Sequence, residues 1–289
     1  SSEGLQWSLN FEPLQEHVFR VRVNALSAVS SKRTKERTFD TSQELQGPFD
    51  YELDESNALV MDRARYKLDG APWHDQEDVL RIDDAIRESL GWPLRTGTMV
   101  QPWCDQGKPA TGPDLELEFE FDVSVLPPEL ELVMEQPDRW DISLNGQSVV
   151  IPSDPKWRID VALKCLPLPI DALRHGKNVL NIKSRIRSDS DIEAIYLFGA
   201  FGVTKKAGRF TLDELPEYIY VGDLVDQGLP FYSGRVCYLK QLQEIDEGAS
   251  FMCELPKFAG ACASVRHGEF EEMLAFPPYQ TQSKATTDR

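Results

Sequence analysis

Two aromatic side chains lie in short segments where proline and glycine restrict the backbone. Trp103 ends the segment VQPW, and Tyr232 lies in the segment PFYSG. Rings held in loops can stack on the C–H faces of neutral ligands such as sugars, while a few polar groups fix the orientation of the ligand. Arg235 and Asp223 are the nearest polar companions of Tyr232, and Trp140 is a further candidate ring. The alternative is that these rings pack in the core, where tryptophan is on average largely buried.

Acidic residues suggest one candidate metal site. Asp189, Asp191 and Glu193 form a D-x-D-x-E run beside a predicted strand, and oxygen-rich clusters of this kind can hold Ca²⁺. The run lacks the glycine and the number of ligands of an EF-hand loop. The alternative is a charged turn from which Ile192 and Ile195 point inward. We therefore expect no cofactor, with a structural calcium ion at this run as the one candidate exception.

The sequence singles out no catalytic residues. A glycosidase needs two carboxylates at a defined separation, and the 48 acidic residues offer no distinct pair. Glu116, Glu118 and Glu120 alternate with apolar residues, which predicts a solvent-facing stripe on a strand. The four histidines lack the HExxH spacing of a zinc enzyme, and neither a glycine-rich phosphate loop nor a GxSxG motif occurs. We therefore predict no catalytic residue and no zinc ligand.

Composition narrows the classes of partner. The 31 basic and 48 acidic residues of the 289-residue chain give a net charge of -17, which argues against binding to nucleic acid. No apolar run reaches the roughly 18 residues of a membrane-spanning helix. The five cysteines are odd in number and lack CxxC spacing, so they favour reduced thiols and a cytoplasmic rather than a secreted setting. The first ten residues do not resemble a signal peptide, although a signal upstream of Ser1 stays open.

Period-two alternation predicts the fold class. From Leu115 to Val123, apolar residues alternate with acidic ones, which is typical of an antiparallel strand with one buried face. Further strands are predicted at 58–68, 130–134, 141–144, 178–186, 236–242 and 263–266. The dipeptides Asp69-Gly70 and Asn145-Gly146 tolerate the positive φ angles of tight hairpin turns. The chain is therefore predicted to be all-β and antiparallel.

One short connector helix is also predicted. Its N-cap is expected at Asp83 or Asp84, its apolar side includes Ile86 and Leu90, and Gly91 ends it. A single helix does not suggest an α/β fold.

An internal similarity suggests two related units. Residues 115–146 and 236–268 each read as a long strand, a loop, a second strand and a short strand that enters a glycine turn. The predicted organisation is an N-terminal extension or lead-in strand over residues 1–57, a first β-sandwich over 58–215 and a second, incomplete β-sandwich with a tail over 216–289. The second unit is either truncated or completed by earlier strands.

The first copy resembles the galactose-binding-like jelly roll of family 2 and rhamnosidase-like glycoside hydrolases. In those proteins a short strand that ends in Asn-Gly is followed by a later strand that begins with GxNxL. Here ISLNG at residues 142–146 is followed by WRIDV at 157–161 and HGKNVLNIK at 175–183. Flanking segments extend the similarity over roughly residues 58–280.

The resemblance implies two jelly-roll-like antiparallel β-sandwiches without the catalytic barrel of those enzymes. The implied function is a non-catalytic module that binds carbohydrate or buttresses a catalytic domain of the same protein. Carbohydrate or that domain is the expected partner, and neither nucleic acid nor a membrane is. Two alternatives remain: a glycoside hydrolase in its own right, with a carboxylate pair that the sequence does not identify, and a scaffold that binds protein.

Overall fold

The computed structural model describes residues 43–95, 108–190, 192–206, 209–241, 250–256 and 258–284. These residues form two compact units. The larger unit spans residues 46–240, and the smaller one holds the described residues 43–45 and those after 240. Among the described residues no helix is long and apolar enough to cross a membrane.

Strands dominate both units. The strands of the larger unit are β1 (Asp50–Leu53), β2 (Asn57–Met61), β3 (Arg63–Leu68), β4 (His74–Asp78), β5 (Thr111–Val123), β6 (Leu130–Glu135), β7 (Asp141–Leu144), β8 (Gln147–Ser148), β9 (Trp157–Arg158), β10 (Asp160–Pro167), β11 (Gly176–Arg187), β12 (Ile195–Gly199), β13 (Gly202–Lys206), β14 (Arg209–Asp213) and β15 (Val236–Leu239). Its helices are α1 (Val79–Leu90) and the 3-10 turns η1 (Pro137–Arg139), η2 (Ile170–Ala172) and η3 (Val225–Gln227). The smaller unit contains β16 (Ser250–Glu254), β17 (Ala263–His267), β18 (Phe270–Leu274) and β19 (Gln280–Lys284).

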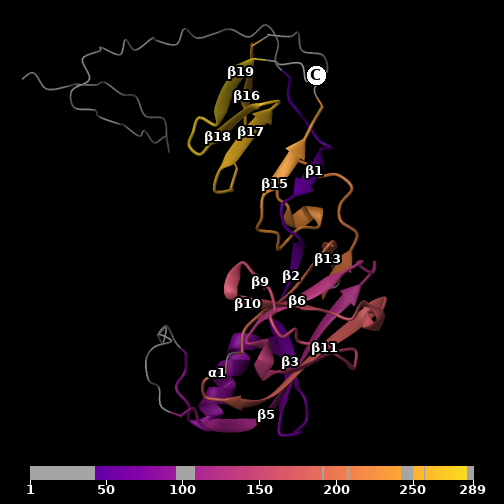
Figure 1. The fold of residues 1–289 in the computed structure, drawn as a ribbon, viewed down its shortest axis with the longest axis vertical. Helices are drawn as coiled ribbons and strands as arrows, with labels where there is room; N and C mark the ends of the chain where they lie inside the picture. Colours follow the sequence, from indigo (N-terminus) through magenta and orange to yellow (C-terminus); the bar gives the residue numbers. More distant parts are fainter. Residues whose placement is uncertain are drawn as a thin grey trace, which may run out of the picture. The chain divides into compact units, whose positions relative to one another are not determined.

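Two main sheets form the larger unit (Figure 1). One has five strands in the order β2-β12-β6-β10-β9. The other has eight: β13-β14-β5-β11-β7-β8 in line, with β3 paired to β5 and β4 paired to β3. The chain changes sheet between β2 and β3, β5 and β6, β6 and β7, β8 and β9, β10 and β11, β11 and β12, and β12 and β13. The predicted all-β class is confirmed, although β14 pairs with β5 in parallel.

The two sheets share one apolar core. The alternation in β5 is confirmed, since Leu115, Leu117, Phe119, Phe121 and Val123 are all buried. They belong to the same cluster of buried side chains as residues of β6 and β12 in the other sheet and of α1. Burying a side chain of this size stabilises a fold by about 1.5–3 kcal/mol, so this interface between the sheets is the main source of stability.

Both predicted hairpin turns are confirmed. Asn145 and Gly146 have φ angles of 50° and 88° and connect β7 to β8. Asp69 and Gly70 have φ angles of 46° and 71°, and the Ala71 amide donates to the Leu68 carbonyl oxygen across the turn at 2.8 Å. Positive φ at both central residues is the geometry that favours Asn-Gly and Asp-Gly pairs.

The motif residues Asn145 and Asn178 hold the fold together. Asn145 Nδ2 donates to Asn178 Oδ1 at 2.8 Å, and Asn145 Oδ1 accepts from the Val179 amide at 3.0 Å. Asn178 is fully buried and donates to the carbonyl oxygens of Arg174 and Gly176. The NG turn and the GxNxL strand are thus joined by side-chain amides, so this part of the motif has a structural role.

Helix α1 begins earlier than predicted. Asp78 is its N-cap, because Asp78 Oδ1 accepts from the amides of Leu80 at 2.9 Å and Arg81 at 3.4 Å. The predicted cap Asp83 lies inside the helix and is buried. The C-terminal end is as predicted, with Gly91 in the left-handed region at φ 67°.

Other boundaries also differ from the predictions. The predicted strand 58–68 is split at Asp62 into β2 and β3, which belong to different sheets. The unit bounds are not those of the predicted domains, because β15 pairs with β1 and so belongs with residues 46–240.

The second copy of the repeat does not reproduce the pairing of the first. β15, β16 and β17 each lie in a separate two-stranded sheet, β1-β15, β16-β19 and β17-β18. The second sandwich is therefore not confirmed. The described cysteines, Cys165, Cys237, Cys253 and Cys262, are free thiols.

Candidate functional site

Exposed tyrosines gather in the segment that connects β14 to β15. We call residues 216–235 the tyrosine loop. Tyr218 is 44% exposed and Tyr220 is 54% exposed, whereas Ile219 between them is fully buried. The Ile219 main chain is paired with Phe49 through hydrogen bonds of 2.8 and 3.1 Å. In an extended segment neighbouring side chains point in opposite directions, so both tyrosines point away from the side on which Ile219 packs.

The Tyr220 ring is supported on one side. A Cβ atom placed on Gly47 would lie 2.6 Å from Tyr220 Cδ1, so the ring rests directly against the glycine backbone. Gln227 fixes the main chain of the same residue: its Oε1 accepts from the Tyr220 amide at 2.6 Å, and its Nε2 donates to the Tyr220 carbonyl oxygen at 3.0 Å. Tyr220 therefore combines a fixed position with an exposed ring.

Asp223 lies in the same turn as Tyr220. The Asp223 carbonyl oxygen accepts from Gln227 Nε2 at 3.1 Å, so one carboxamide joins both residues. Asp223 Oδ1 accepts from the Val225 amide at 2.9 Å. Within the described part of the chain Oδ2 has no hydrogen-bond partner, so it remains able to accept from a ligand hydroxyl.

Tyr232 and Arg235 are brought together by Asp54. The Tyr232 hydroxyl lies 2.9 Å from Asp54 Oδ1 and 2.8 Å from the Arg235 carbonyl oxygen, and it can donate to either. Asp54 Oδ1 also accepts from the Arg235 amide at 2.6 Å. A Cβ atom on Gly234 would lie 2.5 Å from the Tyr232 hydroxyl, so only glycine fits there. The Tyr232 hydroxyl therefore stabilises the loop.

The ionisation of this pair reflects the same contacts. Burial, together with the hydrogen bond to Asp54, raises the pKa of Tyr232 to about 12. The pKa of Asp54 is lowered, chiefly by the Arg235 amide and then by the Tyr232 hydroxyl. At neutral pH the pair is thus a phenol that donates to a carboxylate.

Two predicted ring positions lie elsewhere. Trp140 is 7% exposed and belongs to the core between the sheets, in keeping with the core alternative. It lines a small pocket with Glu135 and Glu193. Trp103 lies outside the described residues.

The pocket beside Trp140 is acidic but narrow. Burial raises the pKa of Glu193, and the charges of Glu135 and Asp83 raise it further against the opposing effect of Arg95. A carboxyl group with a raised pKa can serve as a general acid. The cavity of about 20 Å³, however, has room for about one water-sized group, far less than a sugar needs.

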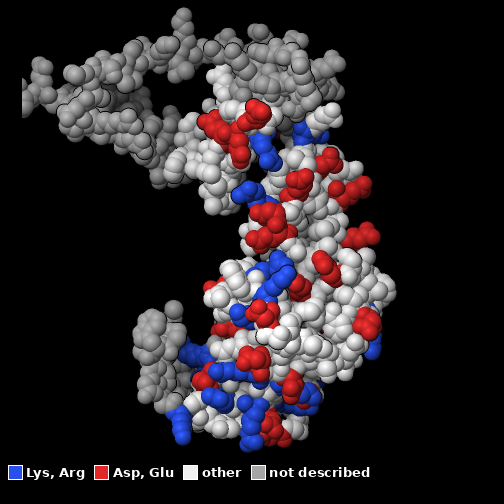
Figure 2. Space-filling model, in the orientation of Figure 1, with Lys and Arg blue, Asp and Glu red and all other residues white. Residues whose placement is uncertain are grey.

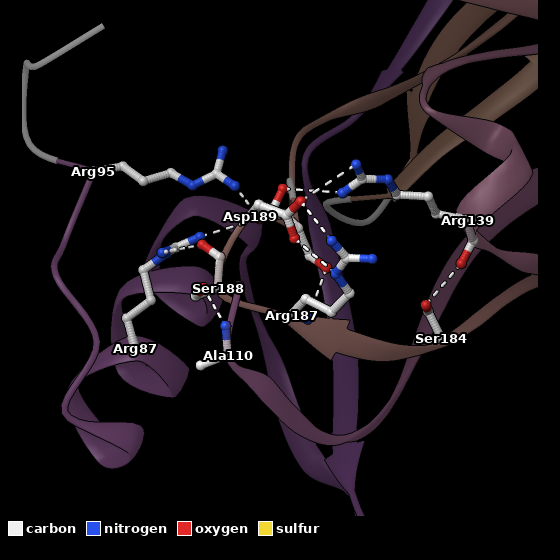
Figure 3. A network of polar contacts seen from close by, with 9 residues as sticks. Arg87, Arg95, Ala110, Arg139, Ser184, Arg187, Ser188 and Asp189 are labelled. Atoms are coloured by element: carbon white, nitrogen blue, oxygen red, sulfur yellow. Dashed lines mark hydrogen bonds and ion pairs between the residues drawn. The ribbon is translucent and has the colours of Figure 1, made fainter. Parts of the chain in front are cut away.

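One acid of the predicted calcium run, Asp189, is paired with arginines (Figure 3). The carboxylate of Asp189 accepts from Arg187 at 3.0 and 3.1 Å, and one of its oxygens lies 3.5 Å from Arg139 Nη2. Asp191 lies outside the described residues. Among the residues that are described, no three His, Cys, Asp or Glu side chains are grouped closely enough to hold a metal ion.

A buried arginine ties α1 to the turn between β11 and β12 (Figure 3). Arg87 Nε donates to Asp83 Oδ2 at 2.6 Å, and its Nη atoms donate to the carbonyl oxygens of Ser188 at 3.2 Å and Ser190 at 3.1 Å. Arg95 also donates to the Ser190 carbonyl oxygen. Both Arg87 and Asp83 are nearly inaccessible to solvent. The sequence analysis did not single out this pair; the signal that could have found it is the spacing of four residues on one helix.

The acidic stripe of β5 is matched by basic residues on its neighbours. Glu116 contacts Lys67 of β3 at 3.0 Å and Lys183 of β11 at 3.2 Å. Burial would raise the pKa of Glu116, but hydrogen bonds from these two lysines outweigh it, so the pKa is lowered. Glu118 pairs with Arg65, and Glu120 with Lys177. The stripe is therefore a cross-strand ion-pair ladder, as expected of a structural surface.

The described turn places an exposed ring beside a carboxylate. Tyr220 offers a fixed ring and Asp223 a nearby acceptor, both in one turn that Gln227 closes. The sequence did not single out Tyr218 or Tyr220; the signal that could have found them is the alternation of tyrosines around Ile219. No protein-family model matches the chain, and no curated protein matches it.

Proposed function

We propose that residues 46–240 form a non-catalytic, galactose-binding-like jelly roll that contacts carbohydrate through the tyrosine loop. Strands that pass back and forth between two facing sheets support the jelly-roll assignment. The hydrogen bond between Asn145 of the NG turn and Asn178 of the GxNxL strand supports it as well. The parallel contact of β14 with β5 departs from a purely antiparallel jelly roll. Buttressing of a catalytic domain by the same sheets is the second part of the proposal.

The position of Tyr220 is the observation that carries the sugar contact. Sugar rings present C–H faces that stack on aromatic side chains, and binding is stronger when the aromatic ring is already fixed. Tyr220 meets both needs, because Gly47 supports its ring and Gln227 fixes its main chain. Asp223 then supplies a carboxylate oxygen within the same turn. Tyr218 extends the exposed aromatic surface.

The test is calorimetric titration of the full chain with a panel of soluble oligosaccharides. We expect Tyr220→Ala to weaken binding by at least about fivefold, since loss of a ring that stacks on a nucleobase costs on the order of 1–3 kcal/mol. Phe276→Ala is the matched control, because Phe276 is an exposed ring in the smaller unit. Trp103→Ala tests the ring position that rests on sequence alone. Absence of any sugar binding would leave the buttressing role and the protein-binding scaffold.

The pocket with Glu193 provides a test of the enzymatic alternative. The raised pKa of Glu193, which lies near Glu135, is the feature that favours an enzymatic function. If the chain hydrolyses aryl glycosides and Glu193→Gln or Glu135→Gln abolishes turnover, the non-catalytic assignment is wrong. We expect no turnover, because the cavity is too small for a sugar ring.

A further inference from the structure

We propose that the tyrosine loop selects among sugars by charge: it favours cationic amino sugars, accepts neutral ones and disfavours sugars that carry carboxylates. This inference rests on the sugar contact proposed above and adds the class of ligand. The Tyr220 ring defines the site, and the charged groups around it define which ligands are favoured.

Acidic residues predominate in the segments that build this site. Two stretches form it, residues 46–55 and 214–240. Their acidic residues are Asp50, Glu52, Asp54, Glu55, Glu214, Glu217, Asp223 and Asp226, and their basic residues are Arg235 and Lys240. Figure 2 shows acidic side chains gathered over the part that contains β1 and β15, whereas basic and acidic side chains mix over the eight-stranded sheet.

Two basic residues offset only part of the charge of the eight acids. Lys240 Nζ donates to the Pro48 carbonyl oxygen at 3.2 Å and lies 5.6 Å from the centre of the Phe49 ring. The Arg235 amide donates to Asp54 Oδ1, and the charge of Arg235 helps to lower the pKa of that carboxyl. The charge of Glu217 and a hydrogen bond to it, and to a smaller degree the charge of Asp50, raise the pKa of the Tyr218 phenol.

Aromatic faces and carboxylates both attract a cation. The face of a tyrosine ring attracts an ammonium group through its quadrupole, and exposed carboxylates attract it through their charge. A uronate meets repulsion from the same groups. Each exposed charge contact changes affinity by about two- to fivefold at low salt, and the effect falls as salt shortens the screening length from about 10 Å at 0.1 M to about 3 Å at 1 M.

The experiment compares three oligosaccharides of equal length by calorimetry. The probes are oligomers of glucosamine, N-acetylglucosamine and galacturonate, at about pH 5.5, where the exposed carboxylates are ionised and the glucosamine amine is protonated. We expect affinity to fall in that order, and the differences to shrink in 1 M salt. Asp223→Asn and Glu217→Gln should each reduce the preference for glucosamine over galacturonate by about two- to fivefold.

Two further variants distinguish binding at the tyrosine loop from attraction to the overall charge of the chain. Tyr220→Ala keeps every charge, so glucosamine binding that survives it would reflect attraction to the net charge of -17 and would overturn the inference. Glu116→Gln removes a carboxylate in the β5 ladder and should leave the preference unchanged. Equal affinity for galacturonate and N-acetylglucosamine would refute the charge selection while the sugar contact stands. If no oligomer binds, the proposed function fails as well.

Discussion

In both the two-sheet core and the tyrosine loop, side-chain carboxamides fix the main chain. In the core they join a turn to a strand, and in the loop they hold a residue whose ring is exposed. In the core, Asn145 and Asn178 join a hairpin turn to β11, and Asn178 is fully buried. In the loop, Gln227 brackets the main chain of Tyr220, whose ring is left 54% exposed. Trp140, a larger ring, is 7% exposed in the core.

The difference separates stability from binding. A ring inside the core contributes through burial, on the order of 25 cal/mol per Å² of apolar surface removed from water. An exposed ring gains little of this. Substitutions in the core should therefore reduce the free energy of unfolding, and substitution of the exposed Tyr220 ring should reduce the proposed sugar binding at nearly constant stability.

The largest effect is expected at Arg87. Arg87→Ala removes the cation that is hydrogen-bonded to buried Asp83, leaves Asp83 only the longer contact with Arg95 at 3.6 Å, and removes the donors to Ser188 and Ser190. Breaking a buried ion pair on one side costs about 3–5 kcal/mol, which urea unfolding followed by circular dichroism would measure. Arg81→Ala is the matched control, since Arg81 of α1 also lies four residues after an acid, Glu77 of β4, but is exposed and 4.0 Å from it.

The control should change stability by less than about 0.5 kcal/mol, as exposed pairs do. If the two variants were equally stable, the Arg87 network would not be what joins α1 to the turn between β11 and β12.

The parts of the fold that the sequence could predict are those that local patterns determine. Local signals were sufficient for the β5 alternation, for both hairpin turns and for the C-terminal end of α1 at Gly91. The predicted start of α1 was wrong, because Asp83 has both the chemistry of a cap and an ion-pair partner one turn later, Arg87, and only the latter role is used. A sequence does not show which of two such roles an aspartate takes.

The candidate site was harder to predict for a similar reason. Tyr232 was chosen for its proline and glycine neighbours, yet those neighbours bring its hydroxyl to Asp54, which lies 178 residues away in the sequence. Tyr220 depends on Gly47, from another distant segment, and no local pattern links the two. Asp223 was chosen as a polar companion of Tyr232, whereas the structure places it in the turn of Tyr220. Long-range pairing through β1 and β15 thus decides which tyrosine ring is exposed.

An intermediate effect is expected at Tyr232 at high pH. Because its pKa is about 12 in the fold and about 10 in the unfolded chain, the unfolded state loses its proton first. Between these values the unfolded chain binds fewer protons, so the free energy of unfolding falls as pH rises. Tyr232→Phe should lower stability near neutrality by about 0.5–1.5 kcal/mol, the net worth of a hydrogen bond, and should make the alkaline decline shallower than in the wild type.

Urea unfolding at a series of pH values between about 9 and about 11.5 would measure that decline. Asp54→Asn should also make it shallower, since the Asp54 carboxylate contributes to the raised pKa of Tyr232. Parallel pH profiles for wild type and Tyr232→Phe would show that the hydroxyl is not held by Asp54 as described.

The smallest effect on stability, and the sharpest test of the comparison, is expected at Gly47. In Gly47→Ala the new methyl group would lie 2.6 Å from Tyr220 Cδ1 and 3.3 Å from the Ile219 carbonyl oxygen, so the exposed ring has to move away. An exposed ring moves at little cost, so we expect the free energy of unfolding to change by about 0.5–1 kcal/mol. Sugar binding should nevertheless fall nearly as far as in Tyr220→Ala, because the ring loses its fixed position. If calorimetry showed wild-type affinity for Gly47→Ala, support from Gly47 would be irrelevant to binding, and the exposed ring would owe its place to the loop alone.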